Sequence, residues 1–356
     1  MLQQDYINNA ETENQSAQED LFEHFRFVVD AGQAVLRIDK FLGGKIANVS
    51  RTRIQAAIEA GNVFVNSKTV KSNYKIKPGE VITILLSFPK IEFELIPENI
   101  PLQIVYEDND LLVVNKPAGM VVHPAVGHFT GTLVNALAFH LQGNELFSEN
   151  DIRSGLVHRI DKDTSGLLVV GKNEKTLNGL GKQFFEHTAS RTYHALVWGN
   201  LPDDEGTITG NVGRHPSNRK VMTVFQDGSS GKHAVTHYRV LRRYTYCTYV
   251  ECRLETGRTH QIRVHFSNLG FPLFNDSEYG GNSIVKGALF SKYKQFVENC
   301  FQICPRQALH AKTLGFVHPV TKKKLMFDSE IPTDMAALLE KWDAYISGRS
   351  DIEKTI

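Results

Sequence analysis

The polar loop around Asp161 is the part of the chain best suited to chemistry. Apolar runs at 156–157 and 167–170 flank a loop that contains Arg159, Asp161 and Asp163. This order predicts a strand, a loop and a second strand. A carboxylate held by a sheet can act as nucleophile, general base or metal ligand, so Asp161 is the first catalytic candidate. Because Asp and Ser also favour ordinary turns, the rest of the chain must distinguish an active site from a turn.

Other kinds of site fit the residues less well. A triad of Ser165, His158 and Asp161 lacks the G-x-S-x-G elbow, and three partners in one short loop rarely reach the geometry of a triad. Asp161 and Asp163 have the spacing of a magnesium-dependent aspartyl phosphatase, but such enzymes need an apolar strand that runs directly into the first Asp, and His158 interrupts that run. The segment 228–233 lacks the spacing and the final Ser or Thr of a phosphate-binding loop.

Length and composition indicate a globular protein with two domains. The chain has 356 residues, of which 41% are hydrophobic, enough for a sizeable core. No apolar run is long enough to span a membrane, and the N-terminus lacks the features of a signal peptide. Four cysteines are too few for a disulfide scaffold, and their spacing differs from a zinc knuckle. We therefore expect a cytoplasmic protein without a metal site.

Charge is unevenly distributed near the N-terminus. Residues 1–25 contain six acidic side chains and no Lys or Arg, which predicts a disordered acidic tail. Residues 37–77 contain nine basic side chains and two acidic ones. A small unit with this excess of positive charge is expected to meet a polyanion.

The basic region has the pattern of a compact unit over 26–88. Helical spacing begins at 38–42, and Ser50 is placed to cap a second helix that ends at Gly61. A hairpin over 63–70 and a strand over 81–84 follow. Arg51 and Arg53 fall in the first turn of the second helix, where cations oppose the helix dipole, so phosphate contact is the natural reason for them.

The remaining chain predicts a larger α+β domain over 101–346. A linker with prolines at 89–100 precedes it, and a tail over 347–356 follows it. Several strands follow one another with few helices between them, which predicts a mixed, largely antiparallel sheet. We expect helices over 133–140, 174–187 and 333–346, a helix that starts after Gly257, and a helical excursion over 282–304.

Two sets of motifs resemble known families. Arg37-Ile-Asp-Lys-Phe-Leu, Ser50-Arg-x-Arg-Ile-Gln and Lys77-Pro-Gly-Glu resemble the S4-type RNA-binding domain. The loop His158-Arg-Ile-Asp-Lys-Asp-Thr-Ser-Gly resembles the signature of the RluA-type pseudouridine synthases, with Ile160 in place of Leu. Three later segments are similar to that family's companion motifs, and they begin at Arg191, Thr256 and Arg306.

The resemblance implies an RNA uridine isomerase that uses an essential Asp and no cofactor. It gives catalytic roles to Asp161, to Tyr193 beneath the uracil and to Arg258 as the ion partner of Asp161. Arg159 is expected to fill the gap that the flipped nucleotide leaves, and Leu309 and Ala311 to wall the pocket. Asp161 attacks ribose C1′ or assists elimination to a glycal; both routes remain open. The residues expected to contact RNA through the S4-like unit are Arg37, Lys40, Arg51, Arg53, Lys68 and Lys71.

The expected substrate is RNA, with 23S ribosomal RNA or a precursor of the large ribosomal subunit favoured. An S4-like domain beside such a catalytic domain is similar to enzymes that modify large-subunit ribosomal RNA. We expect a monomer with no membrane partner. The alternatives are a catalytically silent S4-type RNA-binding or ribosome-assembly protein and the magnesium-dependent aspartyl phosphatase.

Overall fold

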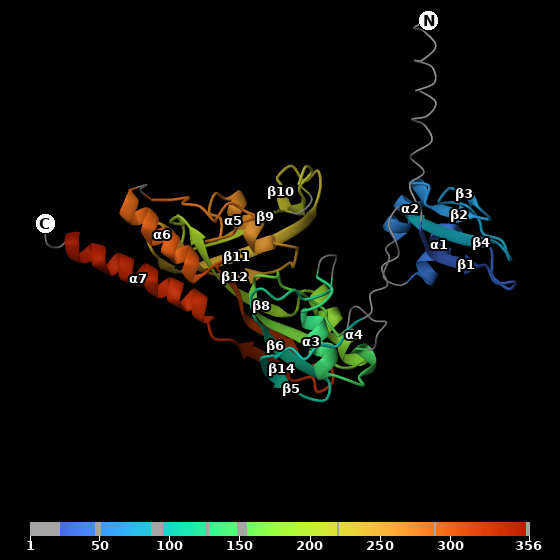
Figure 1. The fold of residues 1–356 in the computed structure, drawn as a ribbon, viewed down its shortest axis with the longest axis horizontal. Coiled ribbons are helices and arrows are strands. Elements are labelled where there is room, and N and C mark those ends of the chain that lie inside the picture. Colours follow the sequence, from blue (N-terminus) through green and yellow to red (C-terminus); the bar gives the residue numbers. More distant parts are fainter. Residues whose placement is uncertain are drawn as a thin grey trace, which may run out of the picture. The chain divides into compact units, whose positions relative to one another are not determined.

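The computed structural model divides the chain into two compact units, residues 1–92 and 93–356, each described here by itself (Figure 1). The boundary falls inside the Pro-containing stretch 89–100 that the sequence marks as a linker. The residues that the structure describes are 22–46, 51–86, 95–124, 128–147, 155–218, 221–287 and 290–353. Among them, no helix has the length and apolar character needed to cross a membrane.

The first unit is a four-stranded sheet with two helices. Its elements are β1 (Phe22–Val28), α1 (Ile38–Lys45), α2 (Arg51–Glu59), β2 (Val63–Val65), β3 (Lys68–Thr69) and β4 (Val81–Leu86). The strand order is β1-β4-β2-β3. Residues 22–25, which their composition assigns to the acidic tail, pair instead with β4 through an alternating aromatic strand. Residues 1–21 and the expected helix cap Ser50 lie outside the described residues.

Apolar side chains at helical and strand spacing form the core of this unit. Ile38 and Leu42 lie one turn apart on α1 and are fully buried, and Ile54 and Ile58 repeat that spacing on α2. They pack with alternate residues of β2 and β4 in a single cluster. The two helices are thereby fixed against one face of the small sheet, and the predicted helix–hairpin order is confirmed.

The second unit is built on one ten-stranded mixed sheet. Its strands are β5 (Ile104–Glu107), β6 (Leu111–Lys116), β7 (Ser165–Gly171), β8 (Ser190–Trp198), β9 (Glu205–Arg214), β10 (Met222–Phe225), β11 (Lys232–Arg243), β12 (Cys247–Leu254), β13 (Leu309–Val317) and β14 (Lys324–Asp328). The order is β10-β9-β11-β12-β8-β13-β7-β6-β5, and β14 pairs with β13. Among these pairs only β13 with β7 is parallel, so the expected α+β class with a largely antiparallel sheet is confirmed.

Helices cover both faces of this sheet. They are α3 (Leu133–His140), the short η1 (Glu145–Phe147), α4 (Glu174–Phe185), α5 (Gln261–Asn268), α6 (Ser291–Ile303) and α7 (Thr333–Glu353). Alternation along β6 shows why: Leu112 and Val114 enter the core under α3 and α5, whereas Leu111 and Val113 enter the core under α4. α6 and α7 pack side by side over aromatic residues such as Trp342 (Figure 1).

Two further predictions differ from the structure. α7 continues to Glu353, because no Pro follows residue 346 and Gly348 is accommodated within the helix, so most of the predicted tail is helical. The expected first strand at 156–157 is only a bridge between Leu156 and Val170. The Asp161 loop therefore enters β7 from an irregular segment, and its position depends on contacts from elsewhere in the chain.

Candidate active site

Lys116, the last residue of β6, holds the Asp161 loop through hydrogen bonds to backbone oxygens. Its ammonium donates to the carbonyl oxygens of Pro117, Met120 and Lys162 at 2.8, 2.9 and 2.9 Å. The side chain is 1% exposed. Burial lowers the pKa of Lys116 to about 7, although the nearby Asp163 carboxylate opposes that shift. Because the three carbonyl groups belong to two different segments, this one side chain ties the end of β6 to the loop.

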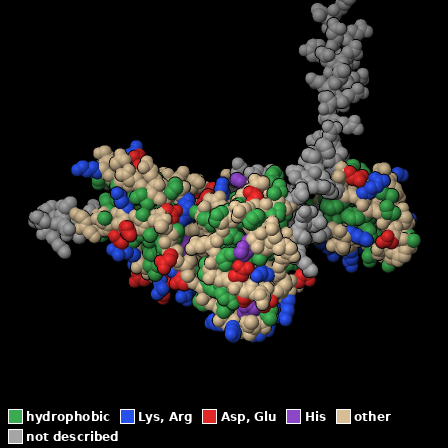
Figure 2. All heavy atoms as spheres, turned by 60° about the horizontal axis from the view of Figure 1, so that its bottom comes forward, with side chains coloured by type: hydrophobic (Ala, Val, Ile, Leu, Met, Phe, Trp, Pro, Cys, Tyr) green, Lys and Arg blue, Asp and Glu red, His purple; other side chains and the backbone are tan. Residues whose placement is uncertain are grey.

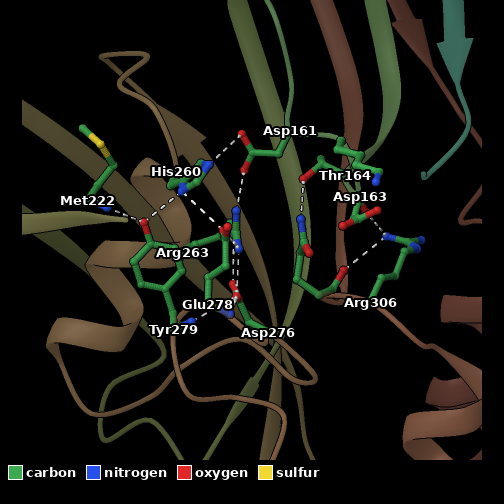
Figure 3. Close-up of polar contacts among 12 residues, drawn as sticks. Asp161, Asp163, Thr164, Met222, His260, Arg263, Asp276, Glu278, Tyr279 and Arg306 are labelled. Carbon is green, nitrogen blue, oxygen red and sulfur yellow. Dashed lines mark hydrogen bonds and ion pairs between the residues drawn. The ribbon is translucent and has the colours of Figure 1, made fainter. Parts of the chain in front are cut away.

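Arg306 holds the loop from the other side. Its Nη1 donates to the carbonyl oxygen of Asp163 at 3.0 Å (Figure 3). Nη1 also donates to the carbonyl oxygen of Leu309 at 3.1 Å, and Nε lies 2.7 Å from a carboxylate oxygen of Asp334. The resemblance to a companion motif pointed to this region without giving Arg306 a role. The structure gives it one, since a guanidinium bound to main-chain oxygens on both sides fixes the spacing of β13 and the loop.

Gly166 allows the loop to meet the sheet. Its φ is +122°, and a Cβ at this position would lie 2.3 Å from the carbonyl oxygen of Ala311. No other residue could occupy the place without moving the β13 backbone. The Thr-Ser-Gly end of the loop motif is therefore explained by the parallel contact between β7 and β13.

Asp161 forms an ion pair with Arg263. The distance from Arg263 Nη1 to Asp161 Oδ2 is 3.2 Å. The other nitrogens of Arg263 are held by carboxylates: Nε is 2.7 Å from Asp276, and Nη2 is 2.8 Å from Asp276 and 2.6 Å from Glu278 (Figure 3). Burial alone would lower the pKa of Arg263, but the hydrogen bond and charge of Asp276 outweigh burial and raise it. Tyr279 supports the guanidinium with its ring centroid 4.9 Å from Cζ.

The expected partner of Asp161 was Arg258, and this assignment is wrong. Arg258 Nε donates to the carbonyl oxygen of His233 at 3.1 Å, and its backbone N–H donates to Gln261 at 2.9 Å. No ion pair joins Arg258 to Asp161, both of which are described. α5 begins at Gln261, so Arg258 precedes the helix, whereas Arg263 lies in its first turn. A cation in a first helical turn opposes the helix dipole, the same signal that marked Arg51, but a helix expected to start directly after Gly257 gives that signal to Arg258.

A cavity of about 620 Å³ opens beside Asp161. Asp161, Tyr193, Arg159 and Arg258 all line it. Tyr193 comes from β8, and burial raises the pKa of its phenol, although the charge of Arg191 opposes that shift. Arg159 is exposed at the cavity and makes no ion pair with another described residue.

The two residues expected to wall the pocket differ in position. Leu309 lines a small cavity together with Asp161 and Tyr193. Ala311 is paired with Tyr193 across the sheet and is 4% exposed. It is not among the described residues that line the two cavities next to Asp161. The Ala311 backbone instead lies against Gly166, where β13 pairs with β7.

Two histidines near the loop have different environments. His158 accepts a hydrogen bond from the Val169 backbone N–H at 3.0 Å, and burial lowers its pKa to about 3, so the ring is neutral and structural. His260 has a left-handed backbone (φ 54°), with Nε2 3.8 Å from Asp161 Oδ1 and Nδ1 2.9 Å from the Tyr279 hydroxyl. Burial lowers the pKa of His260, and Asp161 opposes this.

A group with metal-ligand spacing lies elsewhere. Atoms of Asp108, Asp110 and His318 lie within 4.8 Å of one another. The Asp108 carboxylate accepts hydrogen bonds from Tyr106 and His318 and from two backbone N–H groups of the β5–β6 turn. These hydrogen bonds engage both carboxylate oxygens of Asp108, so we interpret the group as part of the hydrogen bonding that stabilises the turn. All four cysteines are buried and free.

The cations of the first unit fall into two groups. Asp39 is fully buried and binds Arg37 at 3.0 Å and Arg51 at 2.9 Å, so both guanidinium groups are engaged at one end while remaining half exposed. Lys40, Lys68 and Lys71 are exposed and form no ion pair with another described residue. The side chain of Arg53 lies outside what the structure describes. Lys and Arg side chains stand on the surface of this unit in Figure 2.

Models of known families match both units. Residues 36–82 match the S4 domain, and residues 110–268, which include Asp161, Tyr193 and Arg263, match the RNA pseudouridylate synthases. Fold and site thus define an RNA-modifying enzyme that carries its own RNA-binding domain. The chain belongs to the RNA pseudouridine synthase family, whose reaction is an isomerisation, and this confirms the resemblance seen in the sequence.

Relatives cover nearly the full chain. An uncharacterised RNA pseudouridine synthase of Chlorobaculum parvum is 46% identical over 87% of this chain and 94% of its own length. Ribosomal large subunit pseudouridine synthase D of Zymomonas mobilis is 44% identical over 85% and 93%. Among solved structures, human RNA pseudouridylate synthase domain containing 1 is 26% identical, with a TM-score of 0.50 over 68% of this chain and 89% of that one.

Proposed function

We propose that Asp161 is the group that breaks and remakes the bond between uracil and ribose. The observation that carries this proposal is the contact with Arg263, because a guanidinium that Asp276 and Glu278 hold in place fixes the orientation of the Asp161 carboxylate. The Asp161 side chain is 20% exposed at a cavity lined by Arg159 and Tyr193. A carboxylate that is oriented and accessible fits a nucleophile or base.

The proposed reaction is balanced without a cofactor. The N1–C1′ bond breaks, the uracil turns, C5 bonds to C1′, the C5 proton leaves and N1 gains a proton. Asp161 either bonds to C1′ or removes a ribose proton to give a glycal. Tyr193 is the candidate for the group that takes the C5 proton, since its phenol lines the same cavity. Arg159 replaces the stacking of the extruded nucleotide, and Leu309 closes the pocket.

The proposed substrate is the 23S RNA of the large ribosomal subunit or its precursor. Relatives at 39–44% identity carry the name ribosomal large subunit pseudouridine synthase D. The S4 unit would hold the RNA backbone through its exposed cations: Arg37, Lys40, Arg51, Arg53, Lys68 and Lys71. We further propose that the enzyme acts as a monomer in the cytoplasm, where ribosomal RNA is available.

Tritium release tests the role of Asp161. RNA containing uridine tritiated at C5 is incubated with the wild type, with Asp161→Asn and with Asp163→Asn. Asp161→Asn should release no tritium while binding RNA with nearly unchanged affinity, because it loses the reacting group and keeps its volume. Asp163→Asn makes the same chemical change two residues away and should keep activity within about tenfold. Normal turnover by Asp161→Asn would refute the assignment.

The same assay separates the alternatives. A silent RNA-binding protein would bind the RNA and release no tritium even as the wild type. A magnesium-dependent phosphatase would lose its activity in EDTA and hydrolyse a phosphoester, whereas the proposed isomerase should be unaffected by EDTA. Mapping pseudouridines in total RNA from cells with and without the gene would identify the target, and an unchanged 23S RNA map would overturn the proposed substrate.

A further inference from the structure

Phe185, the last residue of α4, is the feature that the proposed reaction leaves unexplained. Its side chain is 84% exposed and lines the cavity beside Asp161. The preceding Phe184 turns inward instead and stacks on His158, with centroids 4.3 Å apart and planes 17° apart. An aromatic ring exposed at the edge of the cavity beside Asp161 offers a face on which a flat partner such as a nucleobase can stack.

Arg191 lies next to this aromatic pair and is poorly satisfied within the protein. Its Nε is buried and has no hydrogen-bond partner. In the part of the chain that the structure describes, no carboxylate forms an ion pair with it. Its Cζ lies 5.4 Å from the centre of the Phe184 ring, and its Nη1 lies so close to Gly257 that a Cβ there would come within 2.8 Å. A fixed, unpaired guanidinium at a cavity wall is suited to an anionic ligand.

The position of Arg191 connects two cavities. One is the 620 Å³ cavity beside Asp161, and the other is a groove of about 1030 Å³. The residues that line both are His187, Arg191, Leu254 and Arg258. In the first cavity, Arg159, Arg191 and Arg258 face a single carboxylate, Asp161. The four residues shared by the two cavities therefore include two arginines and no carboxylate, whereas Glu251 and Glu255 line the groove beyond them.

We propose that this junction binds the nucleotide next to the target uridine. The neighbouring base stacks on Phe185, and the phosphate that links it to the target lies against Arg191 and Arg258. Stacking on one aromatic ring and contact with guanidinium groups is how proteins hold single-stranded RNA without reading its sequence. The inference rests on the proposed function, since it takes the nucleotide at Asp161 as its reference.

Binding measurements with altered RNA test the stacking contact. The probes are fluorescent fragments of 23S RNA that span the mapped uridine. One fragment is intact, and each of the others carries a single abasic residue at one of the two positions before the uridine or the two positions after it. One abasic position should weaken binding by the wild type about 5- to 100-fold. Phe185→Ala should show the same loss on intact RNA and no further loss on that abasic RNA. Phe185→Leu should behave like Phe185→Ala, and Phe185→Trp should restore most of the affinity.

A matched control and a phosphate test complete the design. Phe290 is 56% exposed on the same unit but lines neither cavity, so Phe290→Ala should bind every probe as the wild type does. A neutral methylphosphonate at the linking position should weaken binding by the wild type more than binding by Arg191→Gln, which retains only the contact with Arg258. Equal sensitivity of the wild type and Phe185→Ala to all abasic positions would overturn the proposal. Because binding is measured apart from tritium release, such a result would leave the role of Asp161 standing.

Discussion

Arg263 and Asp161 are joined by a contact of 3.2 Å between residues 102 positions apart in the sequence. The Arg263 guanidinium cannot move freely, because Asp276 and Glu278 hold its other nitrogens. The Asp161 carboxylate is thereby oriented by a cation that is itself fixed. Reactive groups need such support, since a small misplacement of a catalytic atom costs much of the rate.

The orientation of Arg263 predicts the effect of a lysine in its place. Arg263→Lys keeps the charge but cannot bind Asp276 through two nitrogens and reach Asp161 with a third. We expect kcat for tritium release to fall by up to about 100-fold, because Asp161 loses its orientation, with RNA affinity nearly unchanged. Arg258→Lys is the matched control and should change RNA affinity more than kcat. The opposite pattern would restore Arg258 as the partner of Asp161.

Lys116 predicts a pH dependence of stability. Its pKa is about 7 in the folded protein and near the ordinary value of 10.5 when unfolded. Between these values the unfolded chain binds more protons, so this group makes stability rise as pH increases. The burial penalty is complete below pH 7 and disappears above the unfolded pKa. The unfolding free energy of the wild type should therefore increase relative to that of Lys116→Met as pH rises, by at most about 1.4 kcal/mol per pH unit.

That comparison also reports on the loop. Lys116→Met leaves three carbonyl groups without their donor, so tritium release should fall even at a pH where the variant is as stable as the wild type. The pH series is measured by urea unfolding, with Lys172→Met as a control lysine on the same unit. A stability difference that stays flat from pH 7 to 10 would show that Lys116 keeps its ordinary pKa.

Gly166 predicts a loss of folding stability that exceeds the cost of backbone conformation alone. Gly166→Ala would bring a methyl group within 2.3 Å of the Ala311 carbonyl oxygen and force β7 from β13. Gly270 also has a positive φ, +80°, but no atom lies within 4 Å of its Cβ position. Gly270→Ala should cost about 1 kcal/mol, and Gly166→Ala several times more. Equal melting temperatures for the two variants would show that the β7–β13 contact relaxes easily.

The S4 unit predicts two separable effects. Lys68→Gln with Lys71→Gln should lower the salt slope of RNA binding by about 0.7 to 0.9 for each phosphate that the unit no longer neutralises, without loss of stability. Asp39→Asn should destabilise the unit instead. Burial alone raises the pKa of Asp39, but hydrogen bonds from Arg37, Arg51 and Gln55 outweigh it and hold the pKa well below its usual range.

The sign of the Asp39 contribution follows from that lowered pKa. The carboxylate stabilises the folded unit fully above its unfolded pKa, and the contribution is lost as pH falls toward the folded value. Wild type and Asp39→Asn should therefore differ in stability by about 1 to 3 kcal/mol at pH 7 and converge in acid. Hydrogen exchange of residues within 22–86 measures the stability of this unit in both proteins. Equal stability of the wild type and Asp39→Asn at neutral pH would contradict a structural role for Asp39.

The local sequence determined the chemistry and the fold class. The Asp161 loop, the β8 tyrosine and the basic S4 unit are each carried by a short run of residues, and alternating apolar residues predict a sheet wherever they occur. The family could be recognised because its motifs are local in the same way. β1 was missed because its aromatic residues follow an acidic segment, and strand pairing with β4 depends on residues about 60 positions away.

Only the tertiary structure decided which cation serves Asp161. Arg258 and Arg263 belong to one motif, and nothing in their spacing shows which side chain turns toward a loop about a hundred residues earlier. The choice depends on where α5 begins and on Asp276, whose carboxylate captures the Arg263 guanidinium from outside the motif. Contacts between distant segments, made by side-chain packing and charge, select one of two chemically equivalent residues.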